Sequence, residues 1–398
     1  MKGETMKRAR NRSVPLLIAV IVALITITFL IETAATMPAF ARKYSMSCTT
    51  CHAPFPRLKP YGDDFAGDGF NLKDKEAPRY FVDAGDQKLT LLRDIPFGIR
   101  FEGYAGYHEV TGKNIDFTSP YVLKLMSGGA LSKQISYYFY FFFSERGEVA
   151  GIEDAFLMFN NVGGSELDLY VGQFQASDPL FKRELRLTYD DYLVYKTAPG
   201  LSSITLAYDR GIMATYGFSS GTDVVFELLN GNGIGAADEN KVYDNDKYKT
   251  VLGRVSQDLG SVLRIGGVGY YGKEGDTAVN EVWMVGPDLT IATPKLTFNA
   301  QYVERRDTDP EFIRWSGDKI ASRGGFGELV FMPKGDRSPW YAVALYNRVE
   351  SDLEPEPVET ITGHVGHVLR TNFRLTAEFT YDISAEESRF LLGFVSGF

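Results

Sequence analysis

The chain has 398 residues, of which 14% are aromatic, and it contains 40 glycines but only two cysteines. Glycine and aromatic residues on this scale do not suit a helical bundle, and the composition lacks the bias of disordered chains. Lys and Arg number 42 against 51 Asp and Glu, a net charge of −9 without a basic stripe, which excludes a nucleic-acid-binding protein. Two cysteines so close together indicate a single chemical motif rather than a disulfide framework.

The first 41 residues have the organisation of an export signal. Basic residues at positions 7 to 12 precede an apolar run of 18 residues, Val14 to Ile31. Ala39-Phe40-Ala41 then provides the small-x-small pattern that signal peptidase cleaves, and Thr33-Ala34-Ala35 is an alternative cut. An apolar run of this length just suffices to span a ~30 Å hydrocarbon core, so an uncleaved inner-membrane anchor is the alternative. We predict a signal peptide over residues 1–41.

A motif for covalent haem attachment follows the signal directly. Cys48-Thr49-Thr50-Cys51-His52 is the c-type haem pattern, in which both thiols bond to the haem vinyl groups and the imidazole becomes the proximal iron ligand. A thioredoxin-like thiol pair would need a βαβ context, and a zinc site would need further Cys or His residues between positions 40 and 80. The motif therefore predicts one covalently attached c-type haem on Cys48, Cys51 and His52.

The haem-binding segment is assigned to residues 42–90, and its part from Arg42 to about Tyr80, fewer than 40 residues, is too short to enclose a cofactor alone. Its only candidate helix lies around residues 60–70 and is interrupted by Gly62, Gly67 and Gly69. Domains below about 40 residues rarely hold a core of their own. Another part of the chain is therefore expected to cover the haem.

Residues 91–398 alternate between apolar and polar side chains over stretches of about ten residues, as barrel strands do. In 295–305 and 373–382 one face is apolar and the other is polar. Strands are predicted at 97–110, 121–131, 135–145, 152–160, 166–176, 203–218, 222–230, 248–258, 262–272, 280–291, 295–305, 323–333, 339–349, 359–370, 373–382 and 387–398. A soluble β-sandwich would alternate as well, so alternation alone does not identify the fold.

The connection lengths decide between a sandwich and a barrel. Long connections follow the odd-numbered predicted strands and short turns follow the even-numbered ones, with the longest connection at 177–202. This asymmetry, an even strand number and a chain that alternates up to the terminal Phe398 predict an all-β, sixteen-stranded antiparallel transmembrane barrel of the outer membrane, with its turns in the periplasm. The least certain strand is 203–218, because Asp209-Arg210-Gly211 could form a turn.

The two halves together resemble a known family. The stretch from Pro38 through the haem motif to Phe55-Pro56-Arg57-Leu58-Lys59-Pro60-Tyr61-Gly62 is similar to the fused monohaem cytochrome–porins of the outer membrane, whose best-known members are iron oxidases. The resemblance is specific over about residues 37–72 and architectural beyond. It implies oxidation of extracellular Fe(II), or of another redox metal, and electron transfer to a periplasmic cytochrome. Outward electron transfer to external metals, and a solute porin with a structural haem, are the alternatives.

The simplest arrangement of such a chain puts the haem at the periplasmic mouth or within a polar barrel lumen, with membrane lipid around the barrel. The direction of electron flow and any catalytic residue stay open. A soluble periplasmic haem protein is the fallback interpretation.

Few residues are candidates for the distal haem ligand. His364 shares strand parity with polar residues and is expected to face the lumen, whereas His367 is expected on the opposite face. Met46 is an alternative distal ligand close to the motif, and His108 is expected near the outer end of its strand. For each histidine outside the motif a hydrogen-bonded or solvated side chain is the plainer interpretation, and a five-coordinate or water-ligated haem is also open.

Acidic residues cluster in two of the predicted outer loops. They are Asp238, Glu239, Asp244 and Asp246, and Asp352, Glu354, Glu356 and Glu359. Such residues steer cations, but they equally serve solvation or lipopolysaccharide contact through divalent ions. The pattern does not define a discrete iron site.

Overall fold

The computed structural model describes residues 39–72, 81–86, 88–89, 91–109, 115–314, 317 and 319–398. The predicted signal peptide lies outside these residues except for Ala39–Ala41. Within the described ranges, no helix has the length and apolar character needed to cross a membrane.

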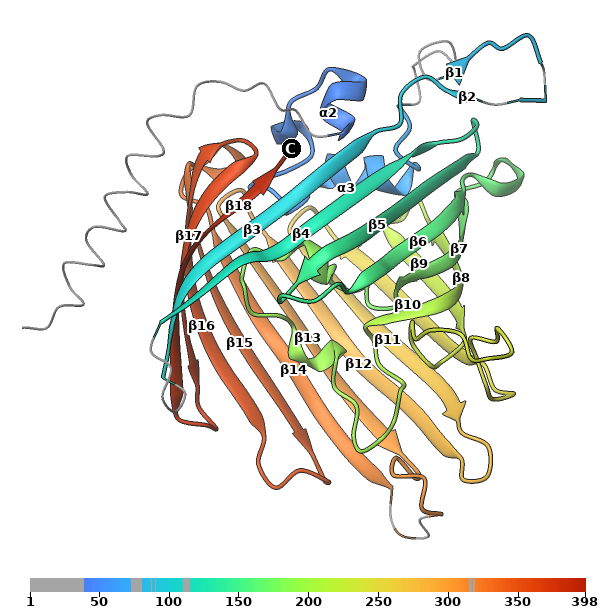
Figure 1. Ribbon diagram of the computed structural model, residues 1–398, viewed down its shortest axis with the longest axis vertical. Helices are drawn as coiled ribbons and strands as arrows, with labels where there is room; N and C mark the ends of the chain where they lie inside the picture. The colour runs from blue at the N-terminus through green and yellow to red at the C-terminus, as the bar shows by residue number, and fades with distance from the viewer. Residues whose placement is uncertain are drawn as a thin grey trace, which may run out of the picture. The chain divides into compact units, whose positions relative to one another are not determined.

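Sixteen antiparallel strands form a closed barrel (Figure 1). β3 (Phe97–His108) pairs with the final strand, β18 (Glu387–Gly397), and so closes the sheet. The strands between them are β4 (Asp116–Ala130), β5 (Ile135–Glu145), β6 (Gly151–Phe159), β7 (Leu167–Gln175), β8 (Tyr208–Gly217), β9 (Thr222–Leu229), β10 (Thr250–Leu259), β11 (Leu263–Glu274), β12 (Asn280–Ala292), β13 (Leu296–Asp307), β14 (Ile320–Phe331), β15 (Trp340–Ser351), β16 (Val358–Arg370) and β17 (Phe373–Asp382). The predicted fold class and strand number are confirmed.

The predicted alternation sets the two faces of the wall correctly. In β17, Arg374 and Glu378 are each 3% exposed and face the lumen, whereas Phe379 is 49% exposed on the outer surface. β13 follows the same rule, with Gln301 inside and Tyr302 outside. An outer surface of apolar side chains is what a barrel in lipid requires.

Some strand boundaries differ from the prediction, most of all the starts of β4 and β8; β4 begins at Asp116 rather than at 121. β8 begins at Tyr208 rather than at 203, and Asp209-Arg210-Gly211 lies within the strand, paired with β7. Ile204 and Leu206 are 1% and 2% exposed because this extended stretch packs one side onto the lumen wall, which produces strand-like alternation outside the sheet. A short hairpin of β1 (Phe81–Val82) and β2 (Leu91–Leu92) precedes the barrel and was not expected.

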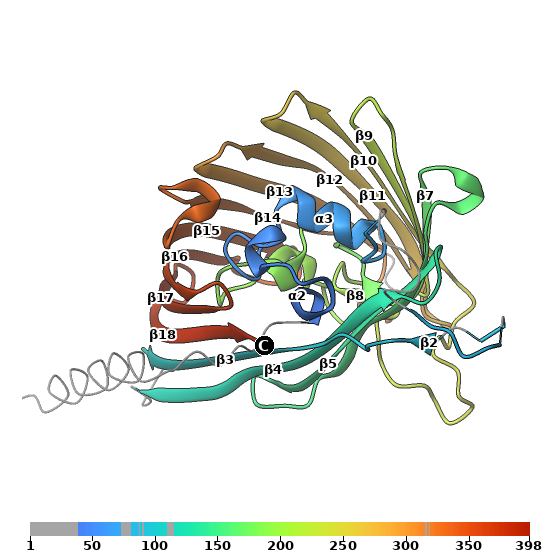
Figure 2. The ribbon, with the colours of Figure 1, turned by 90° about the horizontal axis from the view of Figure 1, so that it is seen from above.

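The helical elements of the N-terminal segment lie at the end of the barrel that carries the short turns. They are α2 (Ala39–Tyr44), the 3₁₀ turn η1 (Cys48–Thr50) and α3 (Pro60–Gly67). Figure 2 shows α2 and α3 inside the ring of strands, with the green backbone of the β7–β8 connection in the interior as well. The C-terminus lies at the same end as α2 (Figure 1).

The lumen has many polar wall residues, as expected from sequence, but it also contains a packed apolar core that was not expected. The 176–207 connection contributes Tyr192, Val194, Tyr195, Ile204 and Leu206 to a core cluster inside the barrel. The wall contributes apolar side chains from strands on the opposite side: Leu229, Leu252, Val268, Tyr270, Val282, Met284, Val303, Phe326, Leu345 and Val349. Many of the lumen-facing apolar residues therefore pack against this connection.

The packing of residues 39–41 predicts the mature N-terminus. Phe40 stacks on Phe70 with ring centroids 4.7 Å apart and meets Phe65 edge-on at 5.4 Å, and Ala39 and Ala41 are buried. Cleavage after Ala41 would remove these contacts, so we expect cleavage after Ala35 and a mature chain that starts at Thr36. Intact-mass spectrometry of exported protein checks this prediction, and a mass that starts at Arg42 would contradict it.

Candidate functional site

The CxxCH motif folds into a compact turn. The Ser47 hydroxyl caps η1 by accepting a hydrogen bond from the backbone N–H of Thr49 at 3.3 Å. The backbone N–H groups of Cys51 and His52 both donate to the carbonyl of Cys48, at 3.2 and 2.9 Å. Cys48 and Cys51 are free thiols and partly exposed. The turn thus keeps both thiols and the imidazole within one short stretch of chain.

The His52 ring is oriented as an iron ligand would be. Its Nδ1 lies 2.9 Å from the carbonyl oxygen of Pro56, so the hydrogen bond assigns the proton to Nδ1 and leaves Nε2 of the neutral ring with a free lone pair, as a metal ligand requires. Phe55 packs edge-on against the ring at 5.2 Å. Burial lowers the pKa of His52, which favours the neutral imidazole that binds a metal.

α3 packs tightly on the motif because of one glycine. The helix runs through Gly62 and ends at Gly67, so Gly62 does not interrupt it as the sequence suggested. A Cβ added to Gly62 would lie 2.5 Å from the carbonyl oxygen of Cys51. Gly62 therefore permits the close approach of α3 to the haem motif.

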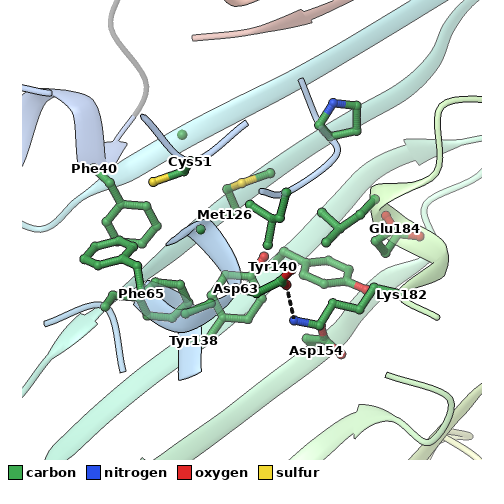
Figure 3. Close-up of a pocket in the computed structure, with 18 of the residues that line it drawn as sticks. Phe40, Cys51, Asp63, Phe65, Met126, Tyr138, Tyr140, Asp154, Lys182 and Glu184 are labelled. Atoms are coloured by element: carbon green, nitrogen blue, oxygen red, sulfur yellow. Dashed lines mark hydrogen bonds and ion pairs between the residues drawn. The ribbon is translucent and has the colours of Figure 1, made fainter. Parts of the chain in front are cut away.

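The segment docks onto several separate parts of the barrel. Arg57 donates to the Thr297 hydroxyl on β13 at 2.9 Å, and the Asn160 amide donates to the carbonyl of Gly67 at 3.0 Å. Asp63 of α3 lies 3.4 Å from Lys182 of the 176–207 connection (Figure 3). The barrel supplies the protein environment that this short segment lacks.

A cavity of about 350 Å³ lies between the segment and the barrel wall. Cys48, Cys51 and His52 line it together with aromatic side chains of the segment and of β5 and β6. Figure 3 shows Phe40 and Phe65 beside Cys51 on one side and the charged side chains of Lys182, Asp154 and Glu184 on the other. The cavity is thus apolar near the thiols and polar at its far end.

Charged side chains of both signs gather at the polar end, where Asp63, Asp154, Asp178 and Glu184 line the cavity with Arg100, Lys124 and Lys182. Lys124 Nζ lies 2.9 Å from a Glu184 carboxylate oxygen, and Arg100 donates to the Glu184 carbonyl at 2.7 Å. Burial alone would raise the pKa of Glu184, but Lys124, Arg100 and Arg186 outweigh burial and lower this pKa to about 2. The stabilisation that the Glu184 carboxylate gives the folded protein is fully present above about pH 4.3, the pKa of a free Glu. It is lost as the pH falls through the lower pKa of Glu184 in the folded protein.

The chemistry of the cavity fits a covalently bound haem. A c-type haem needs two thiols, an imidazole with a free Nε2, apolar contacts for its ring and cations for its propionates. Cys48, Cys51 and His52 meet the first two needs, the aromatic lining meets the third, and Lys124 and Lys182 are cations within the same lining.

The structure brings only some of the predicted distal-ligand candidates to this cavity. Met46 lines it, together with Met126 of β4, Met158 of β6 and Met213 of β8, which the sequence analysis overlooked although each has lumen-facing parity. His364 faces the lumen as expected but is not part of the lining: Nδ1 lies 2.8 Å from Glu378 and Nε2 lies 3.2 Å from the Tyr341 hydroxyl.

The other two histidines lie away from the haem motif. His367 stacks on the exposed Trp340, with ring centroids 4.1 Å apart, which agrees with its predicted outer face. His108 ends β3 at the opposite end of the barrel from the CxxCH turn.

The 176–207 connection is fixed to the wall by charged contacts as well as by its core. Asp191 forms ion pairs with Arg183 and with Lys196, the latter at 2.7 Å. Burial alone would raise the pKa of Asp191, but Arg186, Arg183 and Lys196 lower it far below the usual range.

Residues of the 176–207 connection that precede and follow Asp191 in sequence also contact the barrel wall. The Glu378 carboxylate accepts hydrogen bonds from the backbone N–H groups of Tyr189 and Asp190, at 2.7 and 3.2 Å. Asp190 also pairs with Arg389, and Arg305 donates to the carbonyl of Ile204 at 2.5 Å. The connection therefore forms a fixed partition across the interior, called the partition below.

Comparison with known proteins identifies the fold. No protein-family model matches the chain, and no curated protein matches its sequence. Among solved structures, an anion-selective porin from Comamonas acidovorans is 11% identical, with a TM-score of 0.56 over 77% of this chain and 99% of the porin. The fold is that of an outer-membrane porin.

Two further structures agree with this assignment. The outer membrane channel DcaP of Acinetobacter baumannii is 12% identical, with a TM-score of 0.56 over 77% of this chain and 97% of DcaP. OmpT of Vibrio cholerae in its trimer form is also 12% identical, with a TM-score of 0.55 over 77% of this chain and 99% of OmpT. At these identities the likeness shows the fold alone: a porin-like barrel of the outer membrane, with lipid around its outer face.

The partition is expected to block ion flow through the barrel. Its ends are adjacent, since Ala176 N–H donates to the carbonyl of Ala207 at 2.8 Å, so residues 177–206 can be replaced by a short Gly-Ser linker. We expect the native chain to show low conductance in planar bilayers and the shortened chain to conduct several-fold more, because the lumen core is removed.

A matched control shortens another long connection, residues 236–246, and is expected to leave conductance unchanged. Native conductance equal to that of the partition-deleted chain would contradict the prediction.

Proposed function

We propose that this protein is an outer-membrane monohaem cytochrome that moves electrons inward, from an extracellular one-electron donor to a periplasmic cytochrome. The observation that carries the proposal is the CxxCH turn at an apolar cavity, with Nδ1 of His52 bound to Pro56 and Nε2 left for iron. By resemblance to the cytochrome–porins, Fe(II) is the first donor to test.

Each part of the site has a defined task. Cys48 and Cys51 would hold the haem through thioether bonds, and His52 would be a ligand of its iron. When bound, the haem would accept and donate one electron, with a potential set by its ligands and burial. The aromatic lining would exclude water from the ring, and Lys124 and Lys182, which pair with Glu184 and Asp63, are the cations nearest at hand for the propionates. The docked segment α2–α3 fixes this shell at the mouth of the barrel.

The packed interior supports electron transfer over solute passage. A solute porin needs a continuous water-filled lumen, whereas here the partition and the wall form a shared core. Electrons cross packed protein without an aqueous path. Outward transfer would use the same residues, so the direction depends on the potentials of the two partners.

The orientation of the barrel supports a periplasmic partner. Short turns face the periplasm in bacterial outer-membrane barrels, and the haem segment docks at the short-turn end. A soluble periplasmic cytochrome would therefore approach the haem directly, while the long loops face the external donor.

Covalent haem attachment is the first test. We expect protein exported in cells with c-type maturation to gain the mass of one haem and to show the pyridine haemochrome of a c-type cytochrome. The variant Cys48→Ser/Cys51→Ser is expected to fold as a barrel, judged by heat-modifiable migration, but without covalent haem. Fe(II) added anaerobically to the oxidised native protein should produce the reduced c-type bands.

One result would contradict the proposal as a whole, and a second would contradict its assignment of Fe(II) as the donor. The first is a matured native protein without haem under conditions that mature a reference c-type cytochrome. The second is a haem that dithionite reduces but Fe(II) leaves oxidised across the pH range tested, which would remove Fe(II) as the donor.

A further inference from the structure

A second cavity lies at the other end of the lumen. Its volume is about 170 Å³, and the ends of β3, β15, β16, β17 and β18 line it together with the partition. Arg100 and Gly397 line the haem cavity, whereas His108 and Glu387, at the opposite ends of the same two strands, line this one. This outer cavity is therefore on the long-loop side of the partition, away from the haem motif.

The outer cavity carries unbalanced negative charge. Asp190, Asp382 and Glu387 line it against a single cation, Arg389. Arg389 is already paired with Asp190 and also lies 3.9 Å from Glu378. A concave site with excess carboxylates raises the local concentration of cations.

Asp382 and Glu387 face each other directly across β17 and β18. Like charges at directly opposed strand positions are destabilising, and a bound cation relieves that repulsion. Asp382 Oδ1 accepts hydrogen bonds from the N–H groups of Ser384 and Ala385, at 3.0 and 2.9 Å, which fixes the orientation of this carboxylate.

A second and independent observation comes from the cavity wall. Thr360 is only 9% exposed, and its Oγ1 is buried without a hydrogen-bond partner among the described residues. A buried hydroxyl without a partner costs free energy unless a ligand or water satisfies it. Because Thr360 lines the outer cavity, it is an oxygen available to a bound species there.

We propose that the outer cavity binds a hydrated divalent transition-metal cation through His108, Asp382 and Glu387. Imidazole suits borderline cations such as Fe(II), and carboxylate and water ligands suit both Fe(II) and the harder Mn(II). No three His, Cys, Asp or Glu side chains of the described ranges are arranged to hold a bare ion, so the cation keeps part of its water shell. The cavity has room for these waters.

The outer cavity would also be the place where the electron donor of the proposed function binds. This part of the inference rests on that proposed function. Tyr189, next to Asp190, stacks on Tyr121 at 4.4 Å and meets Tyr104 edge-on at 5.1 Å. The Arg389 guanidinium lies 4.7 Å from the Tyr189 ring centroid.

These rings belong to one contiguous cluster that also contains Met126 and Tyr138, both in the lining of the haem cavity. The cluster would therefore connect a metal in the outer cavity with a haem held by Cys48, Cys51 and His52, and a divalent metal oxidised to the trivalent state would supply the one electron that such a haem takes up.

The test is a titration of Mn(II) into purified full-length protein, with free Mn(II) measured by electron paramagnetic resonance. We expect Asp382→Asn/Glu387→Gln to lower the affinity by about 10- to 100-fold, the range typical when groups that support a metal site are removed. The exposed pair Glu354→Gln/Glu356→Gln removes the same charge from a neighbouring loop and should leave the affinity unchanged. His108→Ala should lower it as well.

Absence of Mn(II) binding in the native protein, or equal affinity in the native and Asp382→Asn/Glu387→Gln proteins, would overturn the site. The same proteins loaded with haem and mixed with Fe(II) separate this inference from the proposed function. If Fe(II) reduces the haem of the variant as fast as that of the native protein at limiting Fe(II), the site fails and the function stands. If Mn(II) binds as expected but Fe(II) never reduces the haem, the site stands and the proposed function fails.

Discussion

The closed barrel imposes the constraint on which the rest of the molecule depends. In lipid every backbone polar group must be paired within the sheet, so the sixteen strands close upon themselves through β18 and β3. A barrel of this strand number encloses a lumen that the wall side chains alone do not fill. This chain fills it from two places, with the docked N-terminal segment at one mouth and the partition across the interior. Both insertions bury apolar surface that would otherwise face water.

The two insertions divide the interior into two chemically different cavities. The inner one is aromatic, contains both cysteines and has its cations at the polar end. The outer one is smaller and acidic and opens on the side of the long loops. Packed aromatic side chains around Tyr104 and Tyr121 lie between them. Such an arrangement suits electron transfer in which the metal donor and the haem occupy different cavities and the electron passes through the protein between them.

The fold could be predicted from sequence because lipid enforces a simple rule. The alternation in 295–305 and 373–382 indicates which side chains face lipid. The lengths of the connections distinguish the end of the barrel with long loops from the end with short turns. The start of β8 was not predictable, because Ile204 and Leu206 alternate for a different reason: they pack a connection onto the lumen wall.

The site was predictable only in part. Cys48, Cys51 and His52 form a local motif whose spacing can be recognised without a structure. The partners of His364 could not be predicted, since Tyr341 and Glu378 come from neighbouring strands at a register that alternation does not report. The packed lumen was missed for a related reason, because apolar lumen-facing residues such as Val282 and Met284 pack against a connection that is distant in sequence. Sequence patterns report which face a residue occupies but not what lies against it.

Vesicles with an enclosed acceptor test the central claim, that electrons rather than metal ions cross this barrel. Haem-loaded protein is reconstituted into vesicles that contain either oxidised cytochrome c or a colour-forming Fe(II) chelator, and Fe(II) is added outside. The account predicts reduction of the enclosed cytochrome without colour in the chelator vesicles, and no reduction with the Cys48→Ser/Cys51→Ser protein. Colour in the chelator vesicles, or equal reduction by the variant, would show that Fe(II) itself passes through the barrel and would contradict the account.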